Sequence, residues 1–581
     1  MKTLPLLLLA ISARAAEPQD FLGWYNSVYV GLSRVANEAA WRASTDVSDA
    51  HEGERTAANT ALQTFLGDRV VIETAKQLLA PRAGLSPVVA RQLDKLILAA
   101  GEGPGTIPEI TAARVAAESR QASLQDGFVL RLEGKPVSAN EIDRVLAQSL
   151  DLGERQRAWE ASKQIGKPLG PGLVELQRLR NQVARAVGQS SYFALEVADY
   201  DMTVPDMMAL LDRLVDDTRP LFRKLHAWVR RELAKRYHQP VPTKIPAHWI
   251  ANRWAQEWDG LAPSVNLDPL FKDKKPEWIV ETAERFWTSL GFASLPKSFW
   301  VRSDLYPVAA GGSRKKNSHA SAWHVDLNED VRSLMSVEPN EKWFRTSHHE
   351  LGHIYYYRSY TQPEVPPILR QGLSRAMHEA IGDLAAIAST QEPYLRAIGV
   401  VPKSMKLDAR QRLLDEALTS AIPFVAWSAG TMAHFEYDLY EKDLPASEFN
   451  ARWWKYVGDY QGVASPTPRD PAGCDACSKT HINDNPAQYY NYAIATVIKY
   501  QLHDHICRRI LQQDPHSCNY FGRKEVGAFL GKLMALGATR PWREVIREAT
   551  GEELSSRALA SYFQSLEKWL DKELRGQPIG W

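Results

Sequence analysis

The stretches HHELGH (348–353) and HEAIGD (378–383) decide the fold and the chemistry of this chain. The first contains H-E-x-x-H, the pattern with which one helix face holds a zinc ion. Side chains four residues apart on a helix have Cβ atoms about 5–6 Å apart. His349 and His353 can therefore both reach one ion through bonds of about 2.0–2.1 Å. Glu350 then addresses a water molecule beside the metal instead of the metal itself.

The second stretch indicates that the histidines of the first are metal ligands and not a chance pattern on a helix. We expect the first stretch on a helix over 339–359 and the second on a helix over 374–389. Glu379 and Asp383 are four residues apart and share one face. Glu379 can supply the third ligand, and Asp383 can accept a hydrogen bond from the other ring nitrogen of a ligating histidine. We therefore predict one zinc ion per chain.

The N-terminus predicts export. A single lysine precedes an apolar run over 4–11, and small residues follow. This run is shorter than the 18 residues of a membrane span, which favours a cleaved signal over residues 1–15 and argues against an uncleaved anchor. Because no later segment reaches transmembrane length, we expect a periplasmic or secreted protein with no transmembrane anchor.

Composition predicts a globular protein with a large hydrophobic core and no nucleic-acid-binding surface. Hydrophobic residues make up 44% of the 581, and 70 Lys and Arg balance 69 Asp and Glu. Such a balance gives no basic surface for nucleic acid. We expect free oligopeptides as partners and a monomer.

Most of the chain has helical periodicity, for example over 207–225 and 278–290. Only 298–308 and 319–327 show the alternation of short strands. No linker rich in Pro, Gly or Ser divides the chain. We therefore predict one mostly α-helical domain over 16–581, with two lobes.

Four cysteines in an exported protein predict disulfides. Cys507 and Cys518 enclose a short loop, and we expect them to pair with each other. Cys474 and Cys477 form a C-x-x-C, which could be a redox-active pair or a structural disulfide. The absence of a thioredoxin-like strand and helix around it favours the structural disulfide.

Several stretches together resemble one known family. They are HHELGH and HEAIGD with SHASAW (318–323), SYFALEVADY (191–200), LHAWVRR (225–231), IPAHWIANRWAQEW (245–258) and WTSLG (287–291). The chain resembles the angiotensin-converting enzyme family of zinc peptidyl-dipeptidases from about residue 20 to its C-terminal helices. The resemblance implies a large helical, two-lobed zinc-peptidase fold of the gluzincin type, with a deep lidded cleft and a few short strands.

The resemblance also implies roles for residues outside the two stretches. His319, next to Ala320, would bind substrate backbone, and His481 a substrate carbonyl. Lys479 and Tyr489 would bind the C-terminal carboxylate of the peptide. Tyr492 would stabilise the oxyanion that develops during attack. At the metal, the resemblance gives His349, His353 and Glu379 as ligands and Glu350 as the general base.

The resemblance predicts the release of C-terminal dipeptides. A related carboxypeptidase branch releases single residues; it has proline where this chain has Ala320 and lacks the lysine matched to Lys479. One position argues for caution, because the family's carboxylate-binding glutamine aligns with Lys272, where the branch has a cation. Lys272 could strengthen the carboxylate anchor as a substrate-binding residue, or it could be a solvated residue in the charged run 272–275. A third reading, an inactive peptide-binding homologue, would require a lost ligand or base, and none is missing.

Chloride activation is not expected. The vertebrate members of the family bind chloride through arginines, which align here with Val457 and Asn491. A tyrosine near the second chloride aligns with Trp228. The sequence therefore predicts that chloride is not required.

Overall fold

The computed structural model describes residues 17–261, 266–309 and 311–581, so the expected signal over 1–15 lies outside the described residues. The chain is mostly α-helical, as predicted. Its helices are α1 (Pro18–Thr45), α2 (Asp49–Leu66), α3 (Arg69–Leu79), α4 (Pro87–Ala99), α5 (Pro108–Gly127), α6 (Ala139–Gln148), α7 (Leu152–Lys163), α8 (Gly166–Ala186), α9 (Tyr192–Ala198), α10 (Val204–Arg236), α11 (Pro276–Ser289), α12 (Lys297–Arg302), α13 (Glu341–Tyr360), α14 (Arg375–Ser389), α15 (Glu392–Ala397), α16 (Ala409–Ser420), α17 (Ile422–Val425), α18 (Ala433–Glu441), α19 (Phe449–Tyr456), α20 (Thr480–Asp484), α21 (Tyr490–His505), α22 (Lys524–Met534), α23 (Trp542–Thr550), α24 (Arg557–Tyr562) and α25 (Gln564–Glu573).

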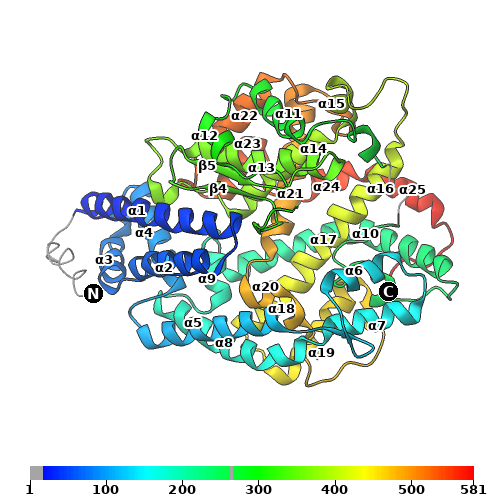
Figure 1. Ribbon diagram of the computed structural model, residues 1–581, viewed down its shortest axis with the longest axis horizontal. Helices are drawn as coiled ribbons and strands as arrows, with labels where there is room; N and C mark the ends of the chain where they lie inside the picture. The colour runs from blue at the N-terminus through cyan, green and yellow to red at the C-terminus, as the bar shows by residue number, and fades with distance from the viewer. Residues whose placement is uncertain (1–16, 262–265, 310) are drawn as a thin grey trace.

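The helices form two groups, in agreement with the predicted lobes. In Figure 1, α11 to α15 with α22 and α23 occupy the upper half, and α5 to α8 with α18 and α19 the lower half. Helices α10, α17 and α21 run between them. One continuous set of buried apolar side chains extends from Phe21 to Leu574 and joins both groups. None of the helices in the described part of the chain is long and apolar enough to span a bilayer.

Helices α13 and α14 match the predicted metal helices to within two residues at each end. Asn340 caps α13, since its side chain accepts a hydrogen bond from the backbone N–H of Trp343 (2.8 Å). Ser374 caps α14 in the same way through the N–H of Met377 (3.2 Å). Both caps fix where the ligand-bearing faces begin.

Two glycines let α13 and α14 lie against each other. A Cβ added to Gly352 would lie 2.9 Å from the Cα of Gly382. A Cβ added to Gly382 would lie 2.9 Å from the ring of His349. The glycines within HHELGH and HEAIGD therefore permit the close helix contact that brings the two motifs together.

The strands are short, and one strand prediction was wrong. Strand β4 (Ser321–His324) lies within the expected segment and pairs antiparallel with β5 (Val331–Leu334). Residues 298–308 instead begin in α12, where Phe299 is buried, and then run irregularly to a single bridge between Asp304 and Leu334. The other pairs are β1 (Arg131–Leu132) with β2 (Lys135–Pro136) and β3 (Ile245–Pro246) with β6 (Val463–Ala464).

One of the two expected disulfides is present. Cys474 and Cys477 are bonded to each other. Cys507 and Cys518 are both buried but free, which corrects the expectation that they pair. The sulfur of Cys507 lies against the His503 ring, 3.6 Å from Nε2. Burial and the neighbouring Cys518 raise the pKa of the Cys507 thiol, so it stays protonated in the core.

Candidate metal centre and active-site cavity

Three metal-binding side chains converge where α13 crosses α14. One ligand atom each from His349, His353 and Glu379 lies within 4.8 Å of the others. The two Nε2 atoms of His349 and His353 are 3.0 Å apart, and His349 Nε2 is 3.8 Å from a carboxylate oxygen of Glu379. Two imidazole nitrogens and one carboxylate oxygen form a donor set that suits zinc. The residues present therefore fit the metal that the sequence predicts.

The second ring nitrogen of each histidine is already occupied. His349 Nδ1 lies 3.1 Å from Asp383, so its proton sits on Nδ1 and Nε2 is free to ligate. His353 Nδ1 lies 2.7 Å from Nδ1 of His378. Lys499 of α21 lies 3.6 Å from the other carboxylate oxygen of Asp383. These partners hold both rings with Nε2 facing the same point.

The charges around the ligands shift their protonation. Burial alone would lower the pKa of His349, but the hydrogen bond and charge of Asp383 raise it to about 9, so a metal ion that binds here must displace the proton on Nε2. Burial and the neighbouring His349 hold the pKa of His353 well below its usual range. Burial would raise the pKa of Asp383, yet Lys499 and His349 hold it well below its usual range. Asp383 is therefore ionised, as an orienting acceptor must be.

Glu350 stands beside the ligands in a large cavity. The cavity has a volume of about 1560 Å³ and is lined by His349, Glu350, His353 and Glu379. Burial, together with the charge of Glu379, raises the pKa of Glu350 to about 7, although His349 opposes the shift. A buried carboxyl with a pKa near neutrality, facing a cavity, is suited to general acid–base chemistry.

Tyr492 lines the same cavity. A row of predicted residues continues from it. The ring of Tyr489 lies 5.0 Å from that of Tyr492, and the ring of His481 lies 4.9 Å from that of Tyr489. Lys479 Nζ lies 5.3 Å from the centre of the Tyr489 ring. The structure thus places these four predicted residues next to one another.

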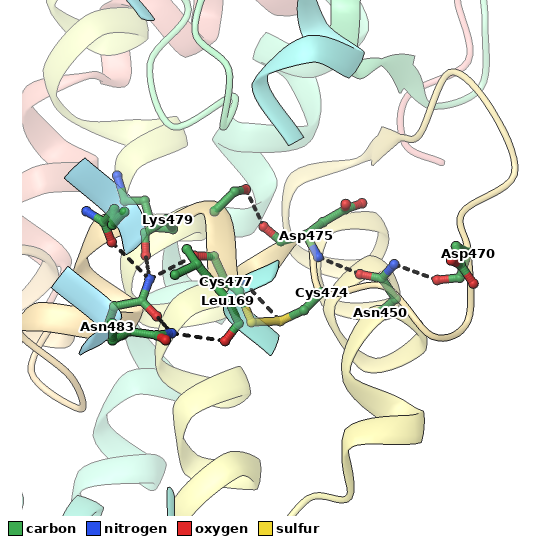
Figure 2. Close-up of a disulfide and its surroundings, with 11 residues drawn as sticks. Leu169, Asn450, Asp470, Cys474, Asp475, Cys477, Lys479 and Asn483 are labelled. Atoms are coloured by element: carbon green, nitrogen blue, oxygen red, sulfur yellow. Dashed lines mark hydrogen bonds between the residues drawn. A yellow bond between two sulfur atoms is a disulfide. The ribbon is translucent and has the colours of Figure 1, made fainter. Parts of the chain in front are cut away.

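Lys479 is a buried cation inside an aromatic enclosure. Its Nζ lies 5.5 Å from the rings of both Trp254 and Trp427. Burial lowers the pKa of Lys479 to about 8, and Arg253 acts in the same direction. Figure 2 shows that the Cys474–Cys477 disulfide lies just before this residue in the chain. A lysine of this kind gains a strong partner when a carboxylate arrives.

The neighbour of Lys479 is Gln256, not Lys272. Lys479 Nζ donates a hydrogen bond to the side-chain oxygen of Gln256 (2.9 Å). Lys272 is exposed, and Gln256 lies beside Lys479, where the alignment had put Lys272. Lys272 sits in a solvated charged run, whereas Gln256 lies in the WAQEW part of the 245–258 stretch that carried the resemblance. That motif was the signal that could have identified it.

His319 and Ala320 line the cavity just before β4. Sequence reasoning missed cations that also line it, among them Arg375 and Lys499. Helical spacing could have found both of them. Arg375 is four residues before Glu379, and Lys499 is seven residues after Tyr492, so each shares a helix face with a predicted site residue.

Comparison with known proteins agrees with this geometry. The family model of peptidase M2, angiotensin-converting enzyme, matches residues 12–581. The chain belongs to the angiotensin-converting enzyme family. This family is made up of zinc metallopeptidases, and the His-His-Glu cluster described above is the donor set that zinc requires.

Individual members of the family are distant in sequence. The chain is 30% identical to the angiotensin-converting enzyme-like protein Ace3 of Mus musculus over 81% of its length, and spans 65% of that protein. It is 31% identical to angiotensin-converting enzyme of Bos taurus over 76% of its length, but spans only 35% of that protein. It is 28% identical to angiotensin-converting enzyme of Theromyzon tessulatum, covering 96% of this chain and 92% of that one.

Proposed function

We propose that this chain is an exported zinc peptidyl-dipeptidase, with residues 16–581 as one catalytic domain, that removes dipeptides from the C-terminus of oligopeptides. One observation supports this above all others. The cavity that holds the three-donor cluster and Glu350 is also lined by Tyr492, and Tyr492 is joined through Tyr489 to a buried lysine. A cation at that place can anchor a peptide carboxylate while the chain reaches back to the metal ligands.

His349, His353 and Glu379 would hold zinc, oriented through Asp383. When bound, zinc supplies a Lewis acid that polarises the scissile carbonyl and makes water more acidic. Glu350 takes the proton of the attacking water and returns it to the leaving amine as the C–N bond breaks.

Tyr492, His481 and His319 stabilise and position the substrate. The hydroxyl of Tyr492 donates to the oxyanion, and His481 donates to a substrate carbonyl. Burial lowers the pKa of His481 to about 4, so its ring is neutral at physiological pH. His319 holds the peptide backbone from the β4 side of the cavity.

Lys479, with Gln256 and Tyr489 beside it, binds the C-terminal carboxylate. An anchor at a fixed place sets how many residues lie between the C-terminus of the substrate and the bond that is cleaved. We assign two residues. The cation at Lys272 was the feature that favoured release of single residues. Because Lys272 is exposed and the side chain bonded to Lys479 is Gln256, Lys272 lends no support to that alternative. We further propose that chloride is not required, since Val457 and Asn491 carry no charge.

A decapeptide digest followed by mass spectrometry tests this function. We expect sequential loss of dipeptides, which disappears in EDTA and in Glu350→Gln. Loss of single residues would make the enzyme a carboxypeptidase. Tight binding of the decapeptide without cleavage would make it a binding homologue.

A further inference from the structure

Ser428 is a fully buried polar residue that the proposed catalytic steps leave unused. It lies in the π-helical turn Ala426–Met432, which joins α17 to α18. Turns of this kind are rare and are found frequently at functional sites. From this turn the Ser428 hydroxyl reaches across to the start of another helix, α21.

The hydroxyl of Ser428 bridges the two ends of the first turn of α21. It donates a hydrogen bond to the carbonyl of Tyr489 (2.7 Å) and accepts one from the N–H of Ala493 (3.2 Å). These residues are four apart, and an α-helix joins such a carbonyl and N–H directly. At the start of α13 the carbonyl of Asn340 and the N–H of Phe344 are joined in that direct way, at 3.1 Å. Ser428 therefore sets the spacing of the first turn of α21.

This turn carries both tyrosines of the proposed site. Tyr489 is the N-cap residue of α21, and Tyr492 is the third residue of the helix. The Tyr492 side chain lines the cavity that also holds Glu350. The ring of Phe424 in α17 lies 6.2 Å from the ring of Tyr489 and 6.1 Å from that of Tyr492. The segment 424–428 thus contacts this turn through an aromatic ring and through a hydroxyl.

Loss of the hydroxyl would change the geometry of the turn without leaving polar groups unpaired. The carbonyl of Tyr489 and the N–H of Ala493 could then bond to each other, so neither would be orphaned in the core. The turn would tighten, and Tyr492, which lies between these two residues, would move with it. A displacement of about 1 Å at a catalytic group can cost about 10²-fold in rate.

We propose that Ser428 is a positioning residue that places the Tyr492 hydroxyl for donation to the substrate oxyanion. This inference rests on the proposed peptidase function. It predicts a larger effect on turnover than on substrate binding, because the oxyanion exists only in the transition state.

Substitutions of Ser428 test this role in the zinc-loaded, full-length enzyme. Removing one oxyanion donor costs about 10²–10³ in turnover, so misplacing it should cost less. We expect about a tenfold fall in kcat for Ser428→Ala, with KM within about threefold. Ser428→Thr keeps the hydroxyl and should recover part of the loss, although its extra methyl group crowds a buried place.

Ser162→Ala is the matched control. Ser162 is also buried, but its hydroxyl donates to the carbonyl of Trp159 in its own helix, α7 (2.6 Å). Since this hydrogen bond is the same in the ground state and the transition state, kcat should change by less than about 1.5-fold.

A double-mutant cycle separates positioning from a structural effect. In a Tyr492→Phe background, Ser428→Ala should lower kcat by less than about twofold, because the hydroxyl that it places is gone. Calorimetry should show about tenfold weaker binding of a phosphinic peptide to Ser428→Ala, with unchanged binding of a product dipeptide. Zinc content and Tm should match those of the parent, since the freed backbone groups bond to each other.

The outcomes that overturn the inference are distinct. A tenfold loss that persists in Tyr492→Phe, or a loss of zinc in Ser428→Ala, would give Ser428 a different role. Unchanged kcat in Ser428→Ala, with Glu350-dependent cleavage intact in the parent, would remove only this inference. A parent that cleaves no peptide would remove the proposed function and the inference together. If Ser428→Ala does not fold, Ser428→Cys, a weaker donor of similar size, is judged by the same criteria.

Discussion

The metal wall, made by α13 and α14, and the anchor wall, made by the side chains around Lys479, are built in different ways. The metal wall consists of α13 and α14, and its ligands His349, His353 and Glu379 lie within 31 residues of the chain. In the anchor wall, Gln256 and Lys479 are 223 residues apart. Helical spacing places the residues of the first wall, whereas tertiary packing places those of the second. Mutations should therefore affect the two walls through different kinetic constants.

The largest effect should come from separating the two metal helices. Gly382→Ala would place a Cβ 2.9 Å from the ring of His349, a contact that requires the ring or the helix to move. Since α14 is buried here, we expect loss of most bound zinc and a fall in activity of at least about 10³-fold. Zinc content measured on the purified protein checks this.

Gly31→Ala is the matched control, because a Cβ there meets nothing within 4 Å in the middle of α1. Alanine is the better helix former by about 1 kcal/mol, so Tm should hold or rise and zinc should stay bound. Full zinc occupancy in Gly382→Ala would show that the helix contact is less tight than the structure has it.

Tyr492→Phe should have the next largest effect. It removes the hydroxyl proposed to face the oxyanion, and we expect kcat to fall about 10²–10³-fold with zinc fully bound. Steady-state kinetics beside a zinc assay measure both quantities. A loss under about fivefold would take Tyr492 out of the mechanism.

The sequence predicts the metal wall better than the anchor wall. Both metal helices, their ligands and the orienting Asp383 could be read from residues four apart on one face. Local rules were enough because each helix carries its own ligands, and one glycine from each motif forms the contact between them. The mostly helical fold followed from periodicity that repeats along the chain.

The remainder depends on contacts that spacing does not encode. Residues 298–308 alternate like a strand, yet burial of Phe299 in α12 and the ion pairs of Asp304 with Arg314 and Lys316 decide their path. Lys272 fitted an alignment but lies in solvent, while Gln256 reaches Lys479 across the fold. Cys507 has its expected partner close by, yet stays a buried thiol against His503.

The anchor wall should respond to pH through binding. Burial lowers the pKa of Lys479 to about 8, so its charged fraction falls from about nine-tenths at pH 7 to about one-tenth at pH 9. Only the charged form attracts a carboxylate. We expect KM for a free-acid peptide to rise up to about tenfold over this range, beyond any change in kcat.

Lys479→Arg separates this titration from those of other groups at the proposed site. Arginine keeps its charge up to about pH 12, so the rise in KM between pH 7 and 9 should vanish even if binding is weaker overall. A parent-like rise in this variant would assign the titration to another group. Lys479→Met should bind the free-acid peptide poorly at every pH.

The smallest expected effect concerns the disulfide that precedes Lys479. Cys474 and Cys477 are buried, and the carbonyl of Cys477 accepts a hydrogen bond from Asn483 (2.8 Å), which also reaches the carbonyl of Lys479 (3.3 Å) (Figure 2). The turn is held by other contacts too. The N–H of Lys479 donates to Ala476 (2.9 Å), and Arg469 pairs with the carboxylate of Asp475 (2.7 Å).

Because these contacts survive reduction, opening the disulfide should loosen the anchor without unfolding it. A bridge that closes so short a loop is worth about 2 kcal/mol in the chain-entropy treatment. We expect the double variant Cys474→Ser with Cys477→Ser to raise KM for a free-acid peptide about threefold, with kcat within about 1.5-fold. A phosphine reductant, which spares zinc, should do the same to the parent.

The double variant is also the control for the reductant, which should leave its kinetics unchanged because the bridge is already absent. A fall in kcat, rather than a rise in KM, would mean that the turn supports the metal wall as well. The two walls would then not be mechanically separate. If KM instead stays constant after reduction, Asn483 and the Arg469–Asp475 pair hold Lys479 without help, and the disulfide stabilises the fold alone.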